Sequence, residues 1–139
     1  MYTDKLSKYS EYAPLFLRLG VGVIFLVHGI GKLFSIGPLA VGVQNFSGFL
    51  AGMGVPAALV VAWIVALVET LGGIAILIGF QTRCASLLVA INIGFALILV
   101  HLKNGFANGN GGFEFPLLLF LATLTLLFMG AGKKLAIDK

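Results

Sequence analysis

Glu69 is the residue of this chain whose surroundings most directly suggest chemistry. It lies in the middle of an apolar run, Val55 to Phe80, that contains no other charged residue. The run is long enough to cross a bilayer, because about 20 apolar residues span the hydrocarbon core. An ionisable group at that depth is costly, so membrane segments usually carry one only where it is paired, solvated or used. A carboxyl group there could bind a ligand or relay a proton.

Four other ionisable residues lie where they could act with this carboxyl group. His28 and Lys32 are four residues apart in the preceding apolar segment, so they share one face of a helix. His101 and Glu114 flank the connection between the last two apolar segments. Imidazole exchanges protons near neutral pH, and an ammonium group can hold an anion or a developing oxyanion. A further cation, Arg18, lies near the start of the first segment.

Each of these residues also has a structural explanation. Glu69 could form a buried ion pair or a protonated carboxyl group bonded to a neighbour. His28 could be a packed core residue, and Lys32 could extend its ammonium group to the lipid headgroups. His101 and Glu114 could join the two ends of a loop. The similar depth of these residues in the membrane is stronger evidence for a functional site than any one of the residues alone.

The pattern of apolar segments predicts an all-α integral membrane four-helix bundle. Pro14, Pro56 and Pro116 suit the first turn of a helix, where a missing N–H does no harm. The whole chain, residues 1–139, forms one membrane domain in this interpretation. The helices are expected at about 13–34, 56–80, 84–102 and 115–130.

The connections between these helices differ in character. Residues 81–83 form a short turn, which makes the second and third helices an antiparallel hairpin. The segment Ser35–Val55 is rich in glycine, and we expect a short helix within Gln44–Met53 that lies in the interface or re-enters the bundle. Residues 103–114 form a loop rich in glycine and asparagine.

Composition supports the membrane assignment and excludes several classes of protein. Hydrophobic residues make up 60% of the chain and charged residues 10%, whereas soluble domains carry about 25% charged residues. The net charge of +4 comes from cations at segment ends, which indicates contact with lipid headgroups and not with nucleic acid. Cys84 is the only cysteine, so no internal disulfide can form, and with two histidines we expect no metal site.

The N-terminal segment resembles a signal peptide only superficially. Lys5 and Lys8 precede about 20 apolar residues, which exceed a typical signal-peptide core, and no clear cleavage site follows. We therefore expect this segment to remain as the first helix. Lysine and arginine gather on the side of the two termini, so the positive-inside rule predicts that both termini are cytoplasmic. Glu69 then lies near mid-depth, the other four candidates lie toward the outer side, and Arg18 lies near the inner surface.

The chain resembles the DoxX family of small bacterial four-helix membrane proteins. The resemblance runs from about Pro14 to Gly132. The order and spacing of the matching segments are more specific than any one of these segments. The segments that carry it are Leu17-Arg18-Leu19-Gly20, His28-Gly29-Ile30-Gly31-Lys32-Leu33, Glu69-Thr70-Leu71-Gly72-Gly73-Ile74-Ala75, His101 with Asn104-Gly105-Phe106, and Gly111-Gly112-Phe113-Glu114. The resemblance implies a protein of the bacterial inner membrane.

The resemblance also implies a function. The family is named for a membrane subunit similar to that of a thiosulfate:quinone oxidoreductase, and other members are associated with thiol balance or quinone handling. The first hypothesis is a redox-associated subunit in which Glu69 and His28 move protons and Lys32, His101, Glu114 and Arg18 bind the substrate, a quinone or a small thiol or sulfur compound. It would work with a membrane or redox partner, or as a homo-oligomer. The alternative is a non-catalytic scaffold subunit or a small transporter or channel.

Overall fold

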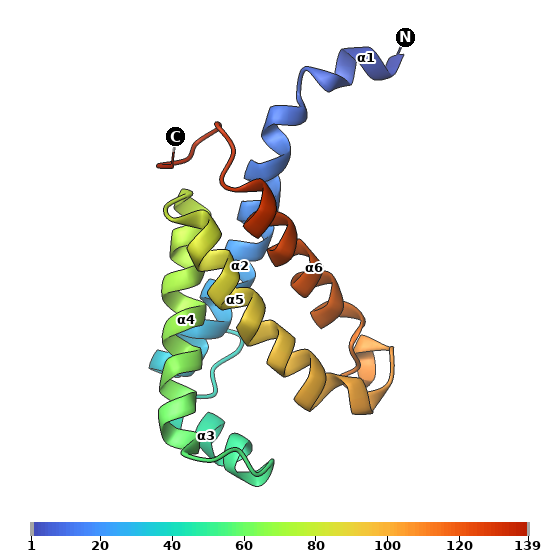
Figure 1. The fold of residues 1–139 in the computed structure, drawn as a ribbon. Coiled ribbons are helices and arrows are strands. Elements are labelled where there is room, and N and C mark those ends of the chain that lie inside the picture. Colours follow the sequence, from blue (N-terminus) through green and yellow to red (C-terminus); the bar gives the residue numbers. More distant parts are fainter. Residues whose placement is uncertain (1, 139) are drawn as a thin grey trace.

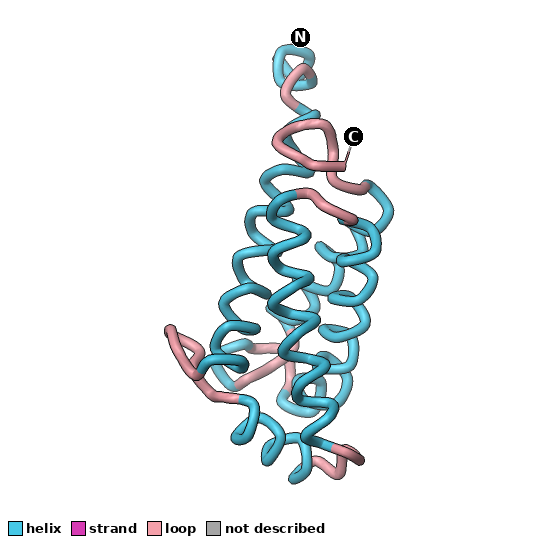
Figure 2. The backbone as a smooth tube through the Cα atoms, turned by 90° about the vertical axis from the view of Figure 1, so that its left-hand side faces the viewer, coloured by secondary structure: helices cyan, strands magenta, loops and turns pink. Residues whose placement is uncertain are grey.

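The computed structural model describes residues 2–138, and these residues form helices and loops without a strand. Four long helices lie side by side: α2 (Ala13–Phe34), α4 (Ala58–Ile78), α5 (Thr82–Ala96) and α6 (Glu114–Met129) (Figures 1 and 2). Two short helices, α1 (Tyr2–Ser7) and α3 (Val43–Gly52), lie near the ends of this bundle. The all-α bundle predicted from the sequence is confirmed, and α3 is the short helix expected between the first two long helices.

Three of the helical segments are long and apolar enough to cross a membrane: Lys5–Phe34, Ala58–Ile78 and Thr82–Asn104. The third segment includes a π-helical turn at Leu97–His101 and a 3-10 turn at Leu102–Asn104, which extend α5. The fourth helix, α6, is apolar but has 16 residues, so its axis is about 24 Å long at 1.5 Å per residue. Helix α6 therefore packs beside the three longer segments as a shorter apolar helix.

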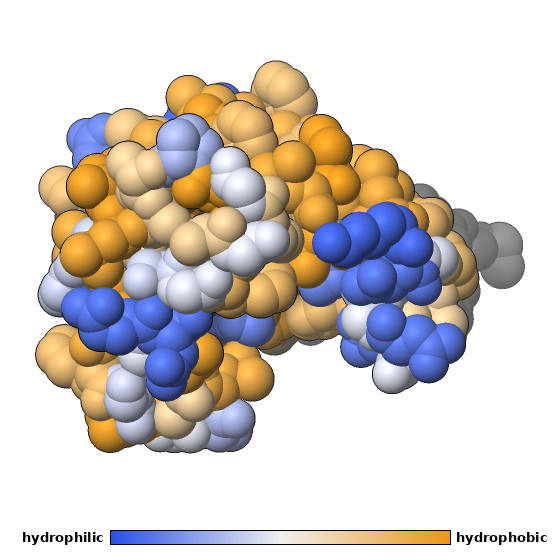
Figure 3. Space-filling model, turned by 90° about the horizontal axis from the view of Figure 1, so that it is seen from below, coloured by the Kyte–Doolittle hydropathy of each residue, from blue (hydrophilic) through white to orange (hydrophobic). Residues whose placement is uncertain are grey.

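The two ends of the bundle differ, and we name them by what they contain. The terminal end holds the N-terminal segment, the turn between α4 and α5, and the C-terminal tail (top of Figure 1). The loop end holds α3 and the connection of residues 102–114 (bottom of Figure 1). Viewed from the loop end, hydrophilic side chains gather in separate patches with hydrophobic side chains between them (Figure 3).

The bundle has two hydrophobic clusters. The larger one lies between α2, α4, α5 and α6 and includes Phe25, Ile76, Val89 and Leu126, each at most 2% exposed. The smaller one packs α3 against α4 and consists of Val43, Leu50, Ala62 and Ala66. Outside these clusters many large hydrophobic side chains are exposed along the long helices, as expected for surfaces that contact lipid.

Glycine allows α2 and α4 to approach closely. A Cβ atom added at Gly73 would lie 2.7 Å from the backbone nitrogen of Leu26 and 3.0 Å from the carbonyl oxygen of Gly22. Small residues permit this kind of contact between membrane helices, whose association depends on close packing. In contrast, α5 leans away from α4 toward the loop end, which separates the 102–114 connection from α3 (Figure 1).

Candidate functional site

An ion pair inside the bundle joins the two residues that the sequence singled out on α2 and α4. The ammonium nitrogen of Lys32 lies 2.6 Å from Oε2 of Glu69, and the two side chains are 10% and 9% exposed. Lys32 lies in the last turn of α2, and Glu69 lies in the middle of α4. Two charges removed from water in this way are tolerable because each provides the counterion of the other.

Asn92 on α5 binds the second oxygen of the same carboxyl group. Its amide nitrogen donates a hydrogen bond of 3.1 Å to Oε1 of Glu69, so the carboxyl group connects α2, α4 and α5. The prediction from the sequence did not include Asn92. The signal was present, because Asn92 is a strongly polar residue within the apolar run 84–100, and such residues commonly bond across membrane helices.

The short helix α3 also contacts the pair. The Lys32 nitrogen lies 4.9 Å from the centre of the Phe46 ring, within the range of a cation–π interaction. Phe46 belongs to the side of α3 that packs on the smaller hydrophobic cluster. The segment between the first two long helices therefore contributes directly to the surroundings of Lys32. The sequence predicted the helix but gave no reason to select Phe46.

Two glycines of α2 determine how closely its neighbours approach near the pair. A Cβ atom at Gly29 would overlap Thr70, whose backbone nitrogen would lie only 2.5 Å away. A Cβ atom at Gly31 would overlap the backbone of Leu39. The carbonyl of Gly31 accepts hydrogen bonds from the N–H groups of Val41 and Gly42, at 3.1 and 3.0 Å. The chain after α2 thus folds back beside Lys32, where it leads into α3.

His28 lies one helical turn before Lys32 on α2. Its side chain is half-buried, and within residues 2–138 it makes no hydrogen bond or ion pair. Neither ring nitrogen is therefore engaged by another group in the described part of the chain. This is the position expected from the four-residue spacing, although no direct bond links His28 to Glu69 in the described part of the chain.

His101 and Glu114 make contacts within the 102–114 connection. Nδ1 of His101 lies 2.8 Å from the carbonyl oxygen of Gly111. Oε1 of Glu114 accepts a 2.6 Å hydrogen bond from the backbone N–H of Asn108. Among the described contacts, none joins either residue to the Lys32–Glu69 pair. Of the five ionisable residues predicted to converge, the described contacts join only Lys32 and Glu69, and His28 lies one turn from Lys32 on α2. His101, at the far end of the α5 segment, and Glu114, at the start of α6, bond within their own connection instead.

Arg18 lies at the terminal end, as its place in the sequence predicted, and it is fully buried. Its guanidinium group donates hydrogen bonds to the carbonyl oxygens of Leu77, Ala131 and Lys134, at 3.2, 2.9 and 3.3 Å, and also to that of Leu135. It thus connects α2 to the end of α4 and to the C-terminal tail. The structure does not bring Arg18 to the ion pair, and its bonds hold the tail in place.

The donors needed for a metal site do not come together in the described part of the chain. No group of three His, Cys, Asp or Glu side chains there is arranged to hold a metal ion. Cys84 is exposed and forms no disulfide. The candidate site therefore consists of the Lys32–Glu69 pair with Asn92, Phe46 and the neighbouring His28.

Comparison with known proteins agrees with this architecture. A family model described as DoxX matches residues 13–102, a range that contains the ion pair and Asn92 and ends before α6. A Bacillus subtilis (strain 168) protein, CatD, whose name provisionally describes it as an oxidoreductase, is 32% identical over 133 residues, which cover 96% of this chain and 90% of the relative. Inner membrane protein YqjF of Escherichia coli (strain K12) is 30% identical over 122 residues, covering 87% and 81% of the two chains. No solved structure matches the chain. These matches show that the chain is a membrane protein of the DoxX family.

Proposed function

We propose that this protein is a redox-associated subunit of the bacterial cytoplasmic membrane that binds a quinone at the Lys32–Glu69 pair. The observation that carries the proposal is the pair itself, a 2.6 Å contact between two nearly buried charges inside a helical bundle. Ionisable groups within membrane segments most often serve binding or proton transfer. The predicted orientation, with both termini in the cytoplasm, places Lys32 in the outer half of the membrane.

The chemistry of a quinone suits these side chains. A quinone that accepts two electrons and two protons becomes a quinol, so a binding site must deliver or remove a proton at a carbonyl oxygen. Lys32 can donate a hydrogen bond to that oxygen and stabilise negative charge that develops on it. Glu69, which is ionised in the pair, can take up a proton from the aqueous phase and pass it to Lys32 after Lys32 has given one to the quinone, and Asn92 holds the carboxyl group in place. The electrons are supplied or taken up by a redox partner protein.

A small thiol or sulfur oxyanion is the second substrate class that this site could accept. Its negative charge would replace Glu69 as the partner of Lys32, and His28 could donate a further hydrogen bond one turn away on α2. The name of the Bacillus subtilis relative supports an oxidoreductase role in general. The two substrate classes are separated by titrating a short-chain quinone and thiosulfate in parallel, beside the extraction experiment.

The experiment is extraction of lipids and cofactors from the protein purified in mild detergent, with the extract measured by mass spectrometry. Wild type and Glu69→Gln are compared, with Gly20→Ala as a control, because a Cβ atom at Gly20 meets no atom within 4 Å. The proposal predicts quinone in stoichiometric amount from wild type and from Gly20→Ala, and a loss of several-fold from Glu69→Gln. Equal recovery from all three proteins would contradict it.

A scaffold function is the second candidate, and one observation favours it. The charges of Lys32 and Glu69 already satisfy each other, and Asn92 satisfies the remaining carboxyl oxygen. The site could therefore serve only to fix α2, α4 and α5 in register. In that case the substitution Glu69→Gln would lower stability and leave quinone content and redox activity per folded molecule unchanged.

A further inference from the structure

The short helix α3 covers the Lys32–Glu69 pair at the loop end of the bundle. Lys32 lies two residues before the end of α2 and is nearly buried, whereas Phe34, at the end itself, is exposed. The centre of the Phe46 ring on α3 lies 4.9 Å from the Lys32 nitrogen. Figure 1 shows α3 beside the start of α4, at the bottom of the bundle. A ligand that approaches the pair from this end must therefore pass α3.

Helix α3 is held to the bundle without a hydrogen bond to another helix in the described part of the chain. Its packing rests on two buried side chains of α3 and two buried alanines of α4: Val43, Leu50, Ala62 and Ala66. The side chains of Asn45 and Ser47 donate hydrogen bonds, but only to carbonyl oxygens four and three residues earlier in the chain. The contact of Phe46 with Lys32 is thus the polar interaction that joins α3 to the site.

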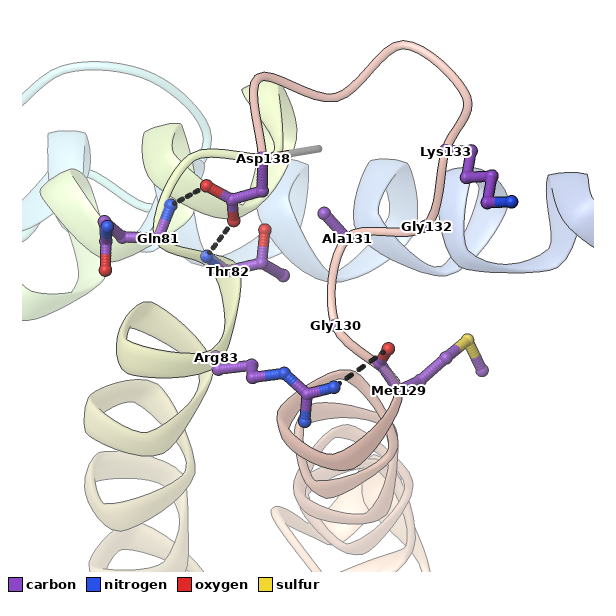
Figure 4. Close-up of a pocket in the computed structure, with 9 residues that line it drawn as sticks. All are labelled: Gln81, Thr82, Arg83, Met129, Gly130, Ala131, Gly132, Lys133 and Asp138. Atoms are coloured by element: carbon purple, nitrogen blue, oxygen red, sulfur yellow. Dashed lines mark hydrogen bonds between the residues drawn. The ribbon is translucent and has the colours of Figure 1, made fainter.

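The opposite end of the bundle is fixed differently, by hydrogen bonds between elements. Beside a cavity of about 440 Å³, the Asp138 carboxylate of the tail accepts hydrogen bonds of 2.9 Å from the N–H groups of Gln81 and Thr82 (Figure 4). Arg83 on α5 donates to carbonyl oxygens at the end of α6. Within residues 2–138, α3 has no bond of this kind to a long helix. Segments with few buried contacts open locally at a lower cost than the rest of a protein, so α3 is the element best suited to move.

Glycine on each side of α3 provides a hinge. Gly42 precedes the helix with a φ of +75°, and Gly54 follows it with a φ of +81°. Glycine adopts these angles without strain and can also leave them, as a hinge requires. The N–H groups of Val41 and Gly42 are bonded to the Gly31 carbonyl oxygen, whereas a Cβ atom at Gly54 would meet no atom within 4 Å. Helix α3 can therefore turn about a point that is fixed to α2.

We propose that α3 is a lid over the Lys32–Glu69 site, closed by the contact of Phe46 with Lys32 and opened by rotation about the glycines at its ends. Opening separates the Phe46 ring from the ammonium group and uncovers Ala62, which is completely buried in the closed state. The ligand then reaches Lys32 from the loop end, and closure of the lid removes the site from water. The use of this opening for ligand entry rests on the proposed function, whereas the motion of α3 does not.

The test measures the opening of α3 through the reactivity of a buried cysteine in the full chain, purified in mild detergent. Cys84→Ser removes the native thiol, and Ala62→Cys places a thiol beneath α3, where a water-soluble maleimide reacts only when α3 moves away. Phe46→Leu should speed this labelling about fivefold, the effect of losing one cation–π contact. Phe34→Leu is the matched control and should leave the rate unchanged, because the Phe34 ring is exposed at the same end and makes no ring contact in the described part of the chain.

A second cysteine position shows whether the effect is confined to the lid. Leu119 is buried in the larger hydrophobic cluster near the start of α6, also toward the loop end, so labelling of Leu119→Cys should not respond to Phe46→Leu. Hydrogen exchange of residues 43–52, in proteins without an added cysteine, gives the same comparison if Ala62→Cys fails to fold. Equal labelling and exchange rates in Phe46→Leu and Phe34→Leu, or an equal acceleration at Leu119→Cys and Ala62→Cys, would overturn the proposal.

The rate of quinone association separates the lid from the proposed function. If the ligand enters through the opening of α3, Phe46→Leu should speed association of a short-chain quinone by about the same factor as it speeds labelling of Ala62→Cys, and Phe34→Leu should not. An unchanged association rate beside faster labelling would overturn the role of α3 in ligand entry. Faster labelling without saturable quinone binding to wild type would contradict the proposed function and support the opening of α3.

Discussion

Lys32 and Glu69 lie 37 residues apart in the chain, yet a 2.6 Å contact between Nζ and Oε2 joins them inside the bundle. Their helices can approach because glycine occupies α2 where it meets Thr70, the residue that follows Glu69. The packing of α2 on α4 and the polar contact therefore depend on each other. Any ligand of this site must compete with an ion pair that is already complete.

The first prediction concerns the energetic coupling of the pair. Lys32→Met and Glu69→Met each leave one charged group buried without a counterion, so each should lower the free energy of unfolding by about 3 kcal/mol or more. The double variant removes both charges and should be more stable than the sum of the single effects implies. Unfolding in mixed detergent micelles measures all four proteins. Additive losses would show that the two residues do not interact.

The second prediction concerns Asn92, which bonds to Oε1 of Glu69. Asn92→Leu should lower stability by about 1 kcal/mol, the usual net value of a hydrogen bond, and by more if the carboxyl oxygen stays charged and unpaired. The same substitution in the Glu69→Met background should have little effect, because the acceptor is absent there. A loss of equal size in both backgrounds would assign the role of Asn92 to packing.

The third prediction concerns the glycine contact beside the pair. Gly29→Ala places a methyl group against the backbone of Thr70 and should separate α2 from α4, with a stability loss of about 1–3 kcal/mol. Gly20→Ala is the matched control, since it lies on the same helix and meets no atom within 4 Å. That change should be neutral or slightly stabilising, because alanine favours helix more than glycine does. Similar losses in both variants would contradict the contact.

The fourth prediction concerns Arg18 and the tail. Arg18 donates bonds to four carbonyl oxygens, three of them in the tail, and lysine cannot reproduce its planar array of donors. Arg18→Lys should therefore release residues 131–138, which limited proteolysis and hydrogen exchange would detect as faster cleavage and faster exchange. Protection of the tail equal to that of wild type would show that Arg18 does not hold it.

The fifth prediction concerns pH. The pKa of Asp138 is lowered in the folded protein, chiefly by the hydrogen bond from the Thr82 N–H. Its contribution to tail docking is therefore complete above the ordinary pKa of an aspartate, about 4, and is lost as the pH falls through the lowered value. The amide resonances of Gln81 and Thr82 should shift in that acidic range and not between pH 5 and 8. In Asp138→Asn this shift should be absent, and its persistence would assign it to another group.

The sequence predicted the parts of the fold that depend on local pattern. The apolar segments indicated the four helices, three of them with proline near the start, and the glycine-rich composition of Ser35–Val55 indicated a short helix there. The four-residue spacing of His28 and Lys32 places both side chains on one face of a helix, whatever the helix packs against. These inferences needed only the helical period and the thickness of a bilayer.

Which residues come together in the site depends on tertiary packing, and the pattern of apolar and polar residues in the sequence does not specify that packing. The angle at which α5 leaves α4 decides that Asn92 reaches Glu69 and that His101, at the far end of the same helical segment, bonds instead to Gly111. Asn92 could have been selected as a polar residue in an apolar run. Phe46 could not, because nothing distinguishes it from the other phenylalanines of the chain until α3 is placed against Lys32.

The most direct test of the central claim is equilibrium binding of a short-chain quinone to the purified protein, with thiosulfate titrated in parallel. Wild type, Glu69→Gln and Gly20→Ala are compared after each is shown to be folded. The account predicts saturable quinone binding to wild type and Gly20→Ala that is weakened at least about tenfold, or 1.4 kcal/mol, in Glu69→Gln. Saturable binding of thiosulfate alone would assign the pair to sulfur compounds. Equal quinone binding by wild type and Glu69→Gln, or no saturable binding of either ligand to wild type, would contradict the claim.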